Sequence, residues 1–189
     1  MAVFVNSFFE ERVERLFDLA GTVERIFAVA GLEYRVVGGL AAYLYVEQVA
    51  PDAGRLTRDI DIAVRREDLA KIAEAAKQFG LEYRHVAGVD MLVQAGKPSA
   101  ARAVHLLFTG EKVRPDYPEP VPPLGQAQTI KGVRLISLAD LVRMKLTSFR
   151  LRDETHLKDL DEADLITPEI EGLLSPLLRD RLAQMRARD

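Results

Sequence analysis

Two acidic residues, Asp59 and Asp61, are separated by a single isoleucine in an otherwise apolar segment of the chain. Residues two positions apart on a β-strand share a face, so a strand from Asp59 to Val64 would project both carboxylates to one side and its apolar side chains into a core. Two carboxylates this close favour a cation between them, and Mg²⁺ prefers carboxylate and phosphate oxygens. Such an ion could bridge nucleotide phosphates during phosphoryl or nucleotidyl transfer. The alternative is that the two acids form the solvated face of a half-exposed strand.

A pair of glycines, Gly38-Gly39, precedes the acidic pair by about 20 residues. The segment before it, 34–37, is typical of a short buried strand, and the segment after it, 40–49, is typical of a helix. At such a junction the backbone N–H groups and the positive end of the helix dipole can hold phosphate. A Gly-Gly pair alone indicates only a tight turn. Together with the two acids it predicts a site for a cation and a polyphosphate.

A lysine, Lys145, falls on the apolar stripe of a helix that we expect to start at Leu138. An ammonium group is costly to bury unpaired, so Lys145 either reaches the edge of the interface or meets an anion, such as a triphosphate or the acidic pair. Arg152 follows seven residues later, returns to nearly the same helix face, and could extend a cationic wall. We interpret His85 and His156 as surface residues. The charged run 158–164 is typical of a solvated helix face with internal ion pairs.

The composition excludes several classes of protein. There are 189 residues, of which 48% are hydrophobic, so the chain can bury a sizeable core. The net charge of -3 exerts no bulk attraction on nucleic acid or anionic membranes, and the absence of cysteine excludes disulfides, thiolate zinc sites and cysteine nucleophiles. No segment reaches the roughly 18 apolar residues of a membrane span, and no basic signal sequence opens the chain. We therefore expect a soluble, cytoplasmic protein with no membrane partner.

The pattern of elements predicts an α/β (α+β) fold, in which a short mixed β-sheet is flanked by helices. Five prolines fall within 114–125 and predict an extended connector. Lys131-Gly132 is typical of a hairpin turn, and Ser137 of a helix N-cap with Asp140 at the capping-box position. We expect an α/β core over residues 1–136, including an N-terminal helix, and a helical segment of two or three helices over 137–189 packed on it. The expected helices are 7–30, 40–49 and 66–79, and the expected strands are 34–37, 59–64, 81–87, 91–94 and 103–108.

The order of strand, Gly-Gly, helix, loop and the hexapeptide Thr57-Arg58-Asp59-Ile60-Asp61-Ile62 resembles the nucleotidyltransferase superfamily. That superfamily includes DNA polymerase β, minimal nucleotidyltransferases and the toxin-side nucleotidyltransferases of toxin-antitoxin and abortive-infection systems. The resemblance covers 34–64. A looser one over 137–166 rests on Asp140, Lys145 and Lys158-Asp159, and the two together cover about a third of the chain.

The resemblance implies a role for each matching residue. Gly38 and Gly39 would contact nucleotide phosphates. Lys145 and Arg152, which are candidates because of their helix face, would bind the nucleotide if they face the same site. Thr57 and Arg58 would shape the approach to the metal, and Asp59 and Asp61 would bind it. The implied cofactor is Mg²⁺ or Mn²⁺, with a nucleoside triphosphate as substrate.

The chain departs from the superfamily pattern at two positions. Leu40 follows the glycines where relatives often carry Ser or Thr. His105, in the expected strand 103–108, stands where active members usually supply a third carboxylate. Imidazole is a poor ligand for Mg²⁺ but an acceptable one for Mn²⁺ or Zn²⁺, and neutral histidine could instead act as a general base. A third interpretation is a hydrogen-bonded structural histidine.

These features support three functional hypotheses. The first is an enzyme that transfers a nucleoside monophosphate from an NTP to an acceptor hydroxyl, with catalytic residues Asp59, Asp61, His105 and Lys145. The second is a catalytically degenerate protein of this fold that binds or regulates a partner, for example a cognate antitoxin in a toxin-antitoxin pair. The third is an interaction scaffold. The sequence indicates neither the NTP, nor whether the acceptor is RNA, protein or a small molecule, nor the oligomeric state.

Overall fold

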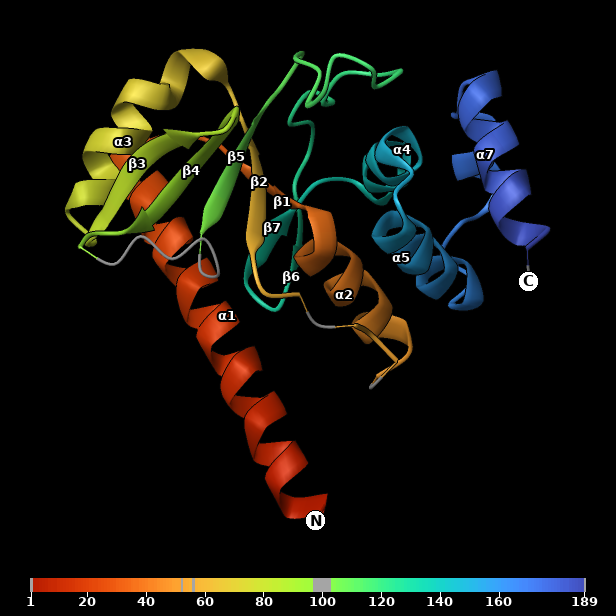
Figure 1. Ribbon diagram of the computed structural model, residues 1–189, viewed down its shortest axis with the longest axis horizontal. Coiled ribbons are helices and arrows are strands. Elements are labelled where there is room, and N and C mark those ends of the chain that lie inside the picture. Colours follow the sequence, from red (N-terminus) through yellow and green to blue (C-terminus); the bar gives the residue numbers. More distant parts are fainter. Residues whose placement is uncertain (1, 52, 56, 97–102, 189) are drawn as a thin grey trace.

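A mixed β-sheet forms the centre of the protein in the computed structural model (Figure 1), which describes residues 2–51, 53–55, 57–96 and 103–188, with side chains from residue 11 onward. Seven strands in these residues follow the order β3-β4-β5-β2-β1-β7-β6. Strand β2 pairs with β1 in antiparallel and with β5 in parallel orientation, which places it near the middle of the sheet. The strands are β1 (Arg35–Val37), β2 (Ile60–Val64), β3 (Leu81–Val86), β4 (Val89–Gln94), β5 (Val104–Phe108), β6 (Gln128–Ile130) and β7 (Val133–Leu135).

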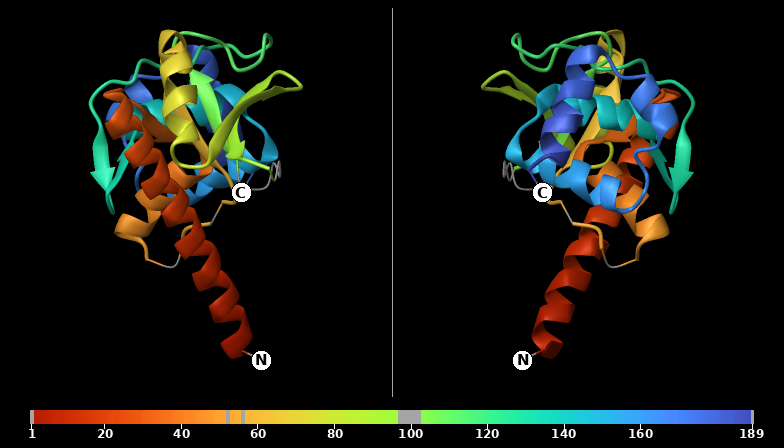
Figure 2. Two further views of the ribbon diagram at one scale, coloured as in Figure 1. Left: turned by 90° about the vertical axis from the view of Figure 1, so that its left-hand side faces the viewer. Right: turned by 90° about the vertical axis from the view of Figure 1, so that its right-hand side faces the viewer.

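The helices form two groups around the sheet. The long helix α1 packs beside α3 and also contacts β2 and β7, whereas α2 packs on β1 and β2 and against the C-terminal helices α4 and α5. The first half of α1 extends well beyond the rest of the molecule (Figures 1 and 2). No helix in the described part of the chain is both long and apolar enough to cross a bilayer. The helices are α1 (Ala2–Ala30), α2 (Gly38–Val49), the 3₁₀ turn η1 (Arg66–Asp68), α3 (Leu69–Lys77), α4 (Leu138–Ser148), α5 (Leu151–Glu162), α6 (Pro168–Gly172) and α7 (Pro176–Arg186).

Strand β2 is apolar because it lies in the sheet interior. Ile60, Ile62, Ala63 and Val64 are all fully buried, and Asp61 is the one residue of this strand with partial exposure. A strand buried on both faces reads as a continuous apolar run, so a single acid within it is a conspicuous exception. The carboxylate of Asp61 avoids full burial because it lines a cavity at the surface of the sheet.

The expected fold class is confirmed, and several local predictions are confirmed with it. Lys131 and Gly132, with φ of 48° and 79°, form the turn of the β6–β7 hairpin. The Ser137 side chain accepts a hydrogen bond from the backbone N–H of Asp140 at 3.1 Å and so caps α4 as predicted. The connector that contains the five prolines carries no helix or strand.

Other predictions need correction. The strand carrying the acidic pair begins at Ile60, so Asp59 lies in the bend before it. The expected helix 66–79 is divided into η1 and α3, and four helices rather than two or three follow Ser137. Asp52, in the loop expected between the helix 40–49 and the hexapeptide 57–62, lies outside the described residues.

Candidate active site

The first residue of α2, Gly38, meets the carboxylate of Asp61. Strand β1 runs directly into α2, and its last residue, Val37, pairs with Asp61 across the β1–β2 ladder. Gly38 has φ of +67°, and a Cβ atom there would lie 2.0 Å from Oδ2 of Asp61. Position 38 therefore requires glycine both for its backbone conformation and for the space that Asp61 occupies. The result is a carboxylate held at the positive end of a helix.

The second glycine, Gly39, brings two further side chains to the same turn. A Cβ atom at this position would lie 2.9 Å from Cβ of Thr57 and 3.4 Å from Cε1 of His156. Thr57 comes from the loop before β2, and His156 comes from α5. The glycine turn is thus the point where the sheet, the loop and the C-terminal helices converge.

Asp59 contributes an unsatisfied carboxylate oxygen to the site. Its Oδ1 is buried and has no hydrogen-bond partner among the described residues. A buried acceptor without a donor is unfavourable, and most such groups in proteins are paired or bind a ligand. This oxygen is therefore available to a cation.

His105 pairs with Asp61 across the parallel β2–β5 ladder. Its Nδ1 lies 3.0 Å from Oδ1 of Asp61, and the two side chains are 25% and 30% exposed. The hydrogen bond to Asp61 raises the pKa of His105 above its ordinary value and outweighs the opposing effect of burial. The structure thus places His105 beside the acids, and its direct partner is Asp61.

Lys145 lies in a buried cluster with Asp153 and His156. Its Nζ donates to Oδ1 of Asp153 at 3.1 Å and to Nδ1 of His156 at 3.0 Å. All three side chains are at least nine-tenths buried. Burial lowers the pKa of Lys145, although the charge of Asp153 opposes this shift.

Asp153 is the centre of this cluster. Besides Lys145, it accepts hydrogen bonds from Ser148 and Arg150, each at 2.8 Å. Burial alone would raise the pKa of Asp153, but hydrogen bonds from Arg150 and Ser148, together with the charges of Lys145 and Arg150, hold it below its ordinary value. The carboxylate is therefore ionised at neutral pH and compensates the charge of Lys145.

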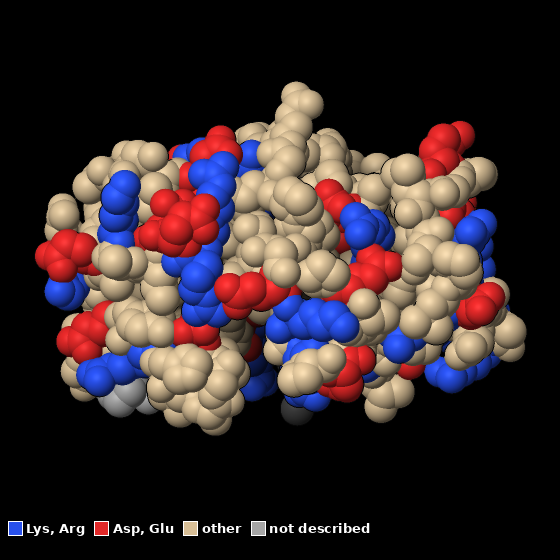
Figure 3. Space-filling model, turned by 90° about the horizontal axis from the view of Figure 1, so that it is seen from above, with Lys and Arg blue, Asp and Glu red and all other residues tan. Residues whose placement is uncertain are grey.

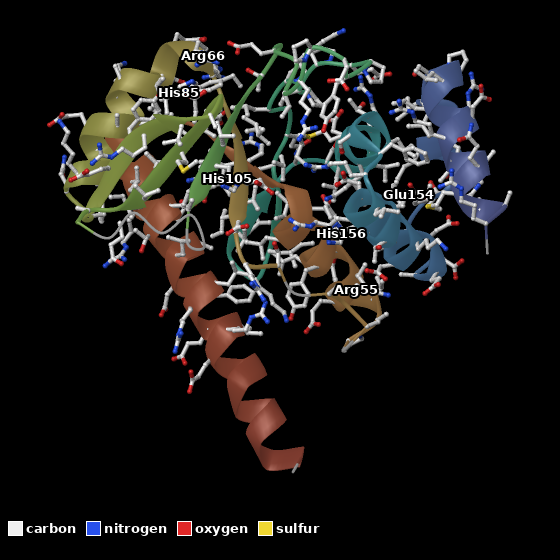
Figure 4. All side chains as sticks on the ribbon, in the orientation of Figure 1. Arg55, Arg66, His85, His105, Glu154 and His156 are labelled. Carbon is white, nitrogen blue, oxygen red and sulfur yellow. The ribbon has the colours of Figure 1, made fainter. Side chains whose placement is uncertain are left out.

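One cavity of about 700 Å³ connects these groups and continues along β4, β5 and the connector after β5. Arg58 does not line it and instead lies in a separate groove beside α1, which Thr57 also lines. In Figure 4, His105 from β5 and His156 from α5 flank the first turn of α2. The predicted residues that line the cavity are Gly38, Gly39, Thr57, Asp59, Asp61, His105, Lys145 and Arg152.

Solved structures that share this fold include the following three. The solution structure of the antibiotic-resistance factor ANT(2'')-Ia matches with a TM-score of 0.55 and 13% identity, over 90% of this chain and 91% of that chain. A crystal structure of the same factor in complex with adenylyl-2''-tobramycin matches with a TM-score of 0.53 and 14% identity, over 89% and 97%. An antigenic nucleotidyltransferase-like protein from Paracoccidioides brasiliensis matches with a TM-score of 0.56 and 18% identity, over 93% and 88%. The chain has a nucleotidyltransferase fold. No family model and no curated protein matches the sequence, so the likeness is carried by the structure.

The nucleotidyltransferase fold implies a divalent metal ion beside the acids, and the residues present fit one. The unpartnered oxygen of Asp59 and the partly exposed carboxylate of Asp61 line the same cavity. Within the described ranges no group of three or more acidic or histidine side chains is placed to hold a metal ion. The protein therefore offers two carboxylates that could hold a divalent ion.

Sequence reasoning missed two members of the site, Asp153 and His156. His156 was expected at the surface but is only 7% exposed, whereas His85 is exposed as predicted. The expected internal ion pairs of 158–164 are also wrong in part, because Asp159 and Asp161 pair with arginines of other elements, Arg55 and Arg186. The only signal for the buried cluster was the lysine on an apolar stripe, which required an anion nearby.

Proposed function

We propose that the protein is a metal-dependent nucleotidyltransferase, which transfers a nucleoside monophosphate from an NTP to an acceptor hydroxyl. The observation that supports this proposal most strongly is the contact between Asp61 and Gly38 at the start of α2. The unpartnered oxygen of Asp59 lies in the same cavity. The shared fold with ANT(2'')-Ia, which one structure shows with adenylyl-2''-tobramycin, supports the same class of reaction.

The residues of the cavity divide into two binding roles. Asp59 and Asp61 would hold a divalent ion, which when bound supplies charge stabilisation at the transferring phosphate. The backbone N–H groups of Gly38 and Gly39 face the phosphates at the helix start. Thr57 and the exposed guanidinium of Arg152 line the same space and add a hydroxyl and a positive charge.

Lys145 and His105 would assist the chemical step. The ammonium group of Lys145 is fixed by Asp153 and adds positive charge near the phosphates. Neutral His105 can donate its Nδ1–H to Asp61, which leaves Nε2 free to accept a proton. In the proposed step the acceptor oxygen bonds to the α-phosphorus, the bond to pyrophosphate breaks, and the hydroxyl proton moves to Nε2 of His105.

The acceptor would lie in the part of the cavity along β4 and the connector after β5. The acids there are already paired, because Asp90 accepts hydrogen bonds from Tyr83 and His85, and Glu111 forms a two-point contact with Arg66. Basic and acidic side chains are also interspersed on the face shown in Figure 3. The acceptor region therefore has no electrostatic field of a single sign that would select one class of acceptor. The proposal covers RNA, protein and small molecules.

A second candidate is a degenerate nucleotidyltransferase that binds or regulates a partner, such as an antitoxin. The hydrogen bond between His105 and Asp61 favours it, because a protonated His105 competes with a metal ion for the same carboxylate.

Label transfer separates the two candidates. Each α-labelled NTP is incubated with the protein, Mg²⁺ or Mn²⁺, and total tRNA or cell lysate. We expect label on one acceptor with the wild-type protein and with Glu14→Gln, which changes an exposed residue of α1, and a loss of label with His105→Ala. Absence of transfer by the wild-type protein with every NTP and acceptor pool, despite NTP binding, would favour the degenerate protein.

A further inference from the structure

His156, a residue of α5, has a buried polar side chain that lies near the start of α2. It is 7% exposed, lines the cavity, and its Cε1 lies 3.4 Å from the position that a Cβ atom on Gly39 would take. The two ring nitrogens flank Cε1, so the contact with Gly39 places the ring edge at the glycine turn. Figure 4 shows His156 between α5 and the beginning of α2.

The proton on this ring is fixed by its neighbours. Nδ1 accepts a hydrogen bond from the ammonium group of Lys145 and therefore carries no proton of its own. Burial and the charge of Lys145 lower the pKa of His156 to about 4, which keeps the ring neutral at physiological pH. A neutral ring with an unprotonated Nδ1 must carry its proton on Nε2.

The hydrogen bond to Lys145 uses Nδ1, which leaves Nε2–H, on the other side of Cε1, to serve as a donor in the cavity that His156 lines. The ring lies near the positive end of α2 and feels the positive charges of Lys145 and Arg152, which the carboxylate of Asp153 opposes only in part. A donor among positive groups calls for an anion, and the anion that the proposed function brings to this turn is the triphosphate of the nucleotide.

We propose that His156 is a phosphate ligand, which donates Nε2–H to the triphosphate of the bound nucleotide at the start of α2. This inference rests on the proposed function. Lys145 and Asp153 are positioning residues for His156, because their ion pair presents a proton to Nδ1 and excludes the other tautomer. Lys145 thus contributes its own positive charge and also orients neutral His156 to make a second contact with phosphate.

The tautomer can be read directly, since the chain contains three histidines. Long-range ¹H–¹⁵N spectra at neutral pH, assigned with His85→Gln, His105→Gln and His156→Gln, report which nitrogen of His156 is protonated. We expect the Nε2–H form in the free protein and a downfield shift of the Nε2 proton on addition of a non-hydrolysable NTP with Mg²⁺. A proton on Nδ1, or an unchanged Nε2 resonance while the nucleotide binds, would overturn the inference.

Binding measurements provide the second test. His156→Leu removes the donor, and loss of a hydrogen bond to a charged group weakens NTP binding about 10- to 100-fold. His156→Gln returns an N–H near the position of Nε2, so it should restore affinity to within a few fold, a rescue that a purely structural role would not produce. His85→Leu is the matched control. Equal NTP affinity of His156→Leu and the wild-type protein contradicts only this inference, whereas failure of the wild-type protein to bind any NTP contradicts the proposed function as well.

Discussion

Oδ2 of Asp61 occupies the space that a side chain on Gly38 would need: a Cβ atom there would lie 2.0 Å away. The carboxylate and the start of α2 can meet only because residue 38 is glycine. This contact makes the acidic strand and the glycine turn one site, although 23 positions of sequence (61 − 38) separate them.

Substitution of Gly38 by alanine should cost both strain and space. The positive φ alone costs an alanine about 1 to 2 kcal/mol, and displacement of Asp61 adds about 1 to 3 kcal/mol. We expect lower stability in urea denaturation and a loss of metal-dependent NTP binding. Gly31→Ala is a matched control, because Gly31 has φ of +63° but open space around its Cβ position. Equal losses of stability in the two variants would show that the clash between the new Cβ atom and Asp61 adds nothing to the cost of the positive φ.

Asp153→Asn should be among the most destabilising single changes at the site. It leaves the buried ammonium of Lys145 without its counter-charge, and breaking a buried ion pair in this way costs about 3 to 5 kcal/mol. The double variant Lys145→Met/Asp153→Asn removes both charges and should recover part of this loss in chemical denaturation. If the double variant is as unstable as the sum of the single variants, the pair is not energetically coupled.

Stability should fall as the pH falls from about 6.5 towards 4, partly because of His156. Its folded pKa of about 4 lies below the ordinary value of 6.5, so within this window the unfolded chain binds a proton that the folded protein does not. The direction is a loss of stability with acidification, of about 3 kcal/mol at most. Denaturation at pH 7 and pH 4.5 should show a smaller decrease for His156→Gln. An identical decrease in wild-type and variant proteins would mean that His156 is not held neutral.

The local features of the site could be predicted because their signals are local. Asp59 and Asp61 are close in sequence, and the Gly38-Gly39 pair directly follows a buried strand and begins a helix. The position of His105 was predicted from the resemblance to the superfamily, and the structure places it on the adjacent parallel strand, where the register sets it opposite Asp61.

The cluster around Lys145 could not be predicted because the chain turns sharply after α4. A continuous helix would place Arg152 on the face of Lys145, but α4 ends at Ser148 and Phe149 adopts a left-handed conformation with φ of 45°. The turn folds α5 back so that Asp153 and His156 reach Lys145. A left-handed phenylalanine has no strong sequence signal, since glycine or asparagine normally fills such a position.

The most direct test of the account is calorimetric titration of each NTP, with Mg²⁺, into the wild-type protein and the Asp59→Asn/Asp61→Asn variant. Asp116→Asn, which changes an exposed acid of the connector, is the control. We expect one NTP to bind the wild-type and control proteins in a Mg²⁺-dependent manner and no metal-dependent binding by the double variant. Unchanged Mg²⁺-dependent binding by the double variant would contradict the central claim that Asp59 and Asp61 hold the metal at the nucleotide site.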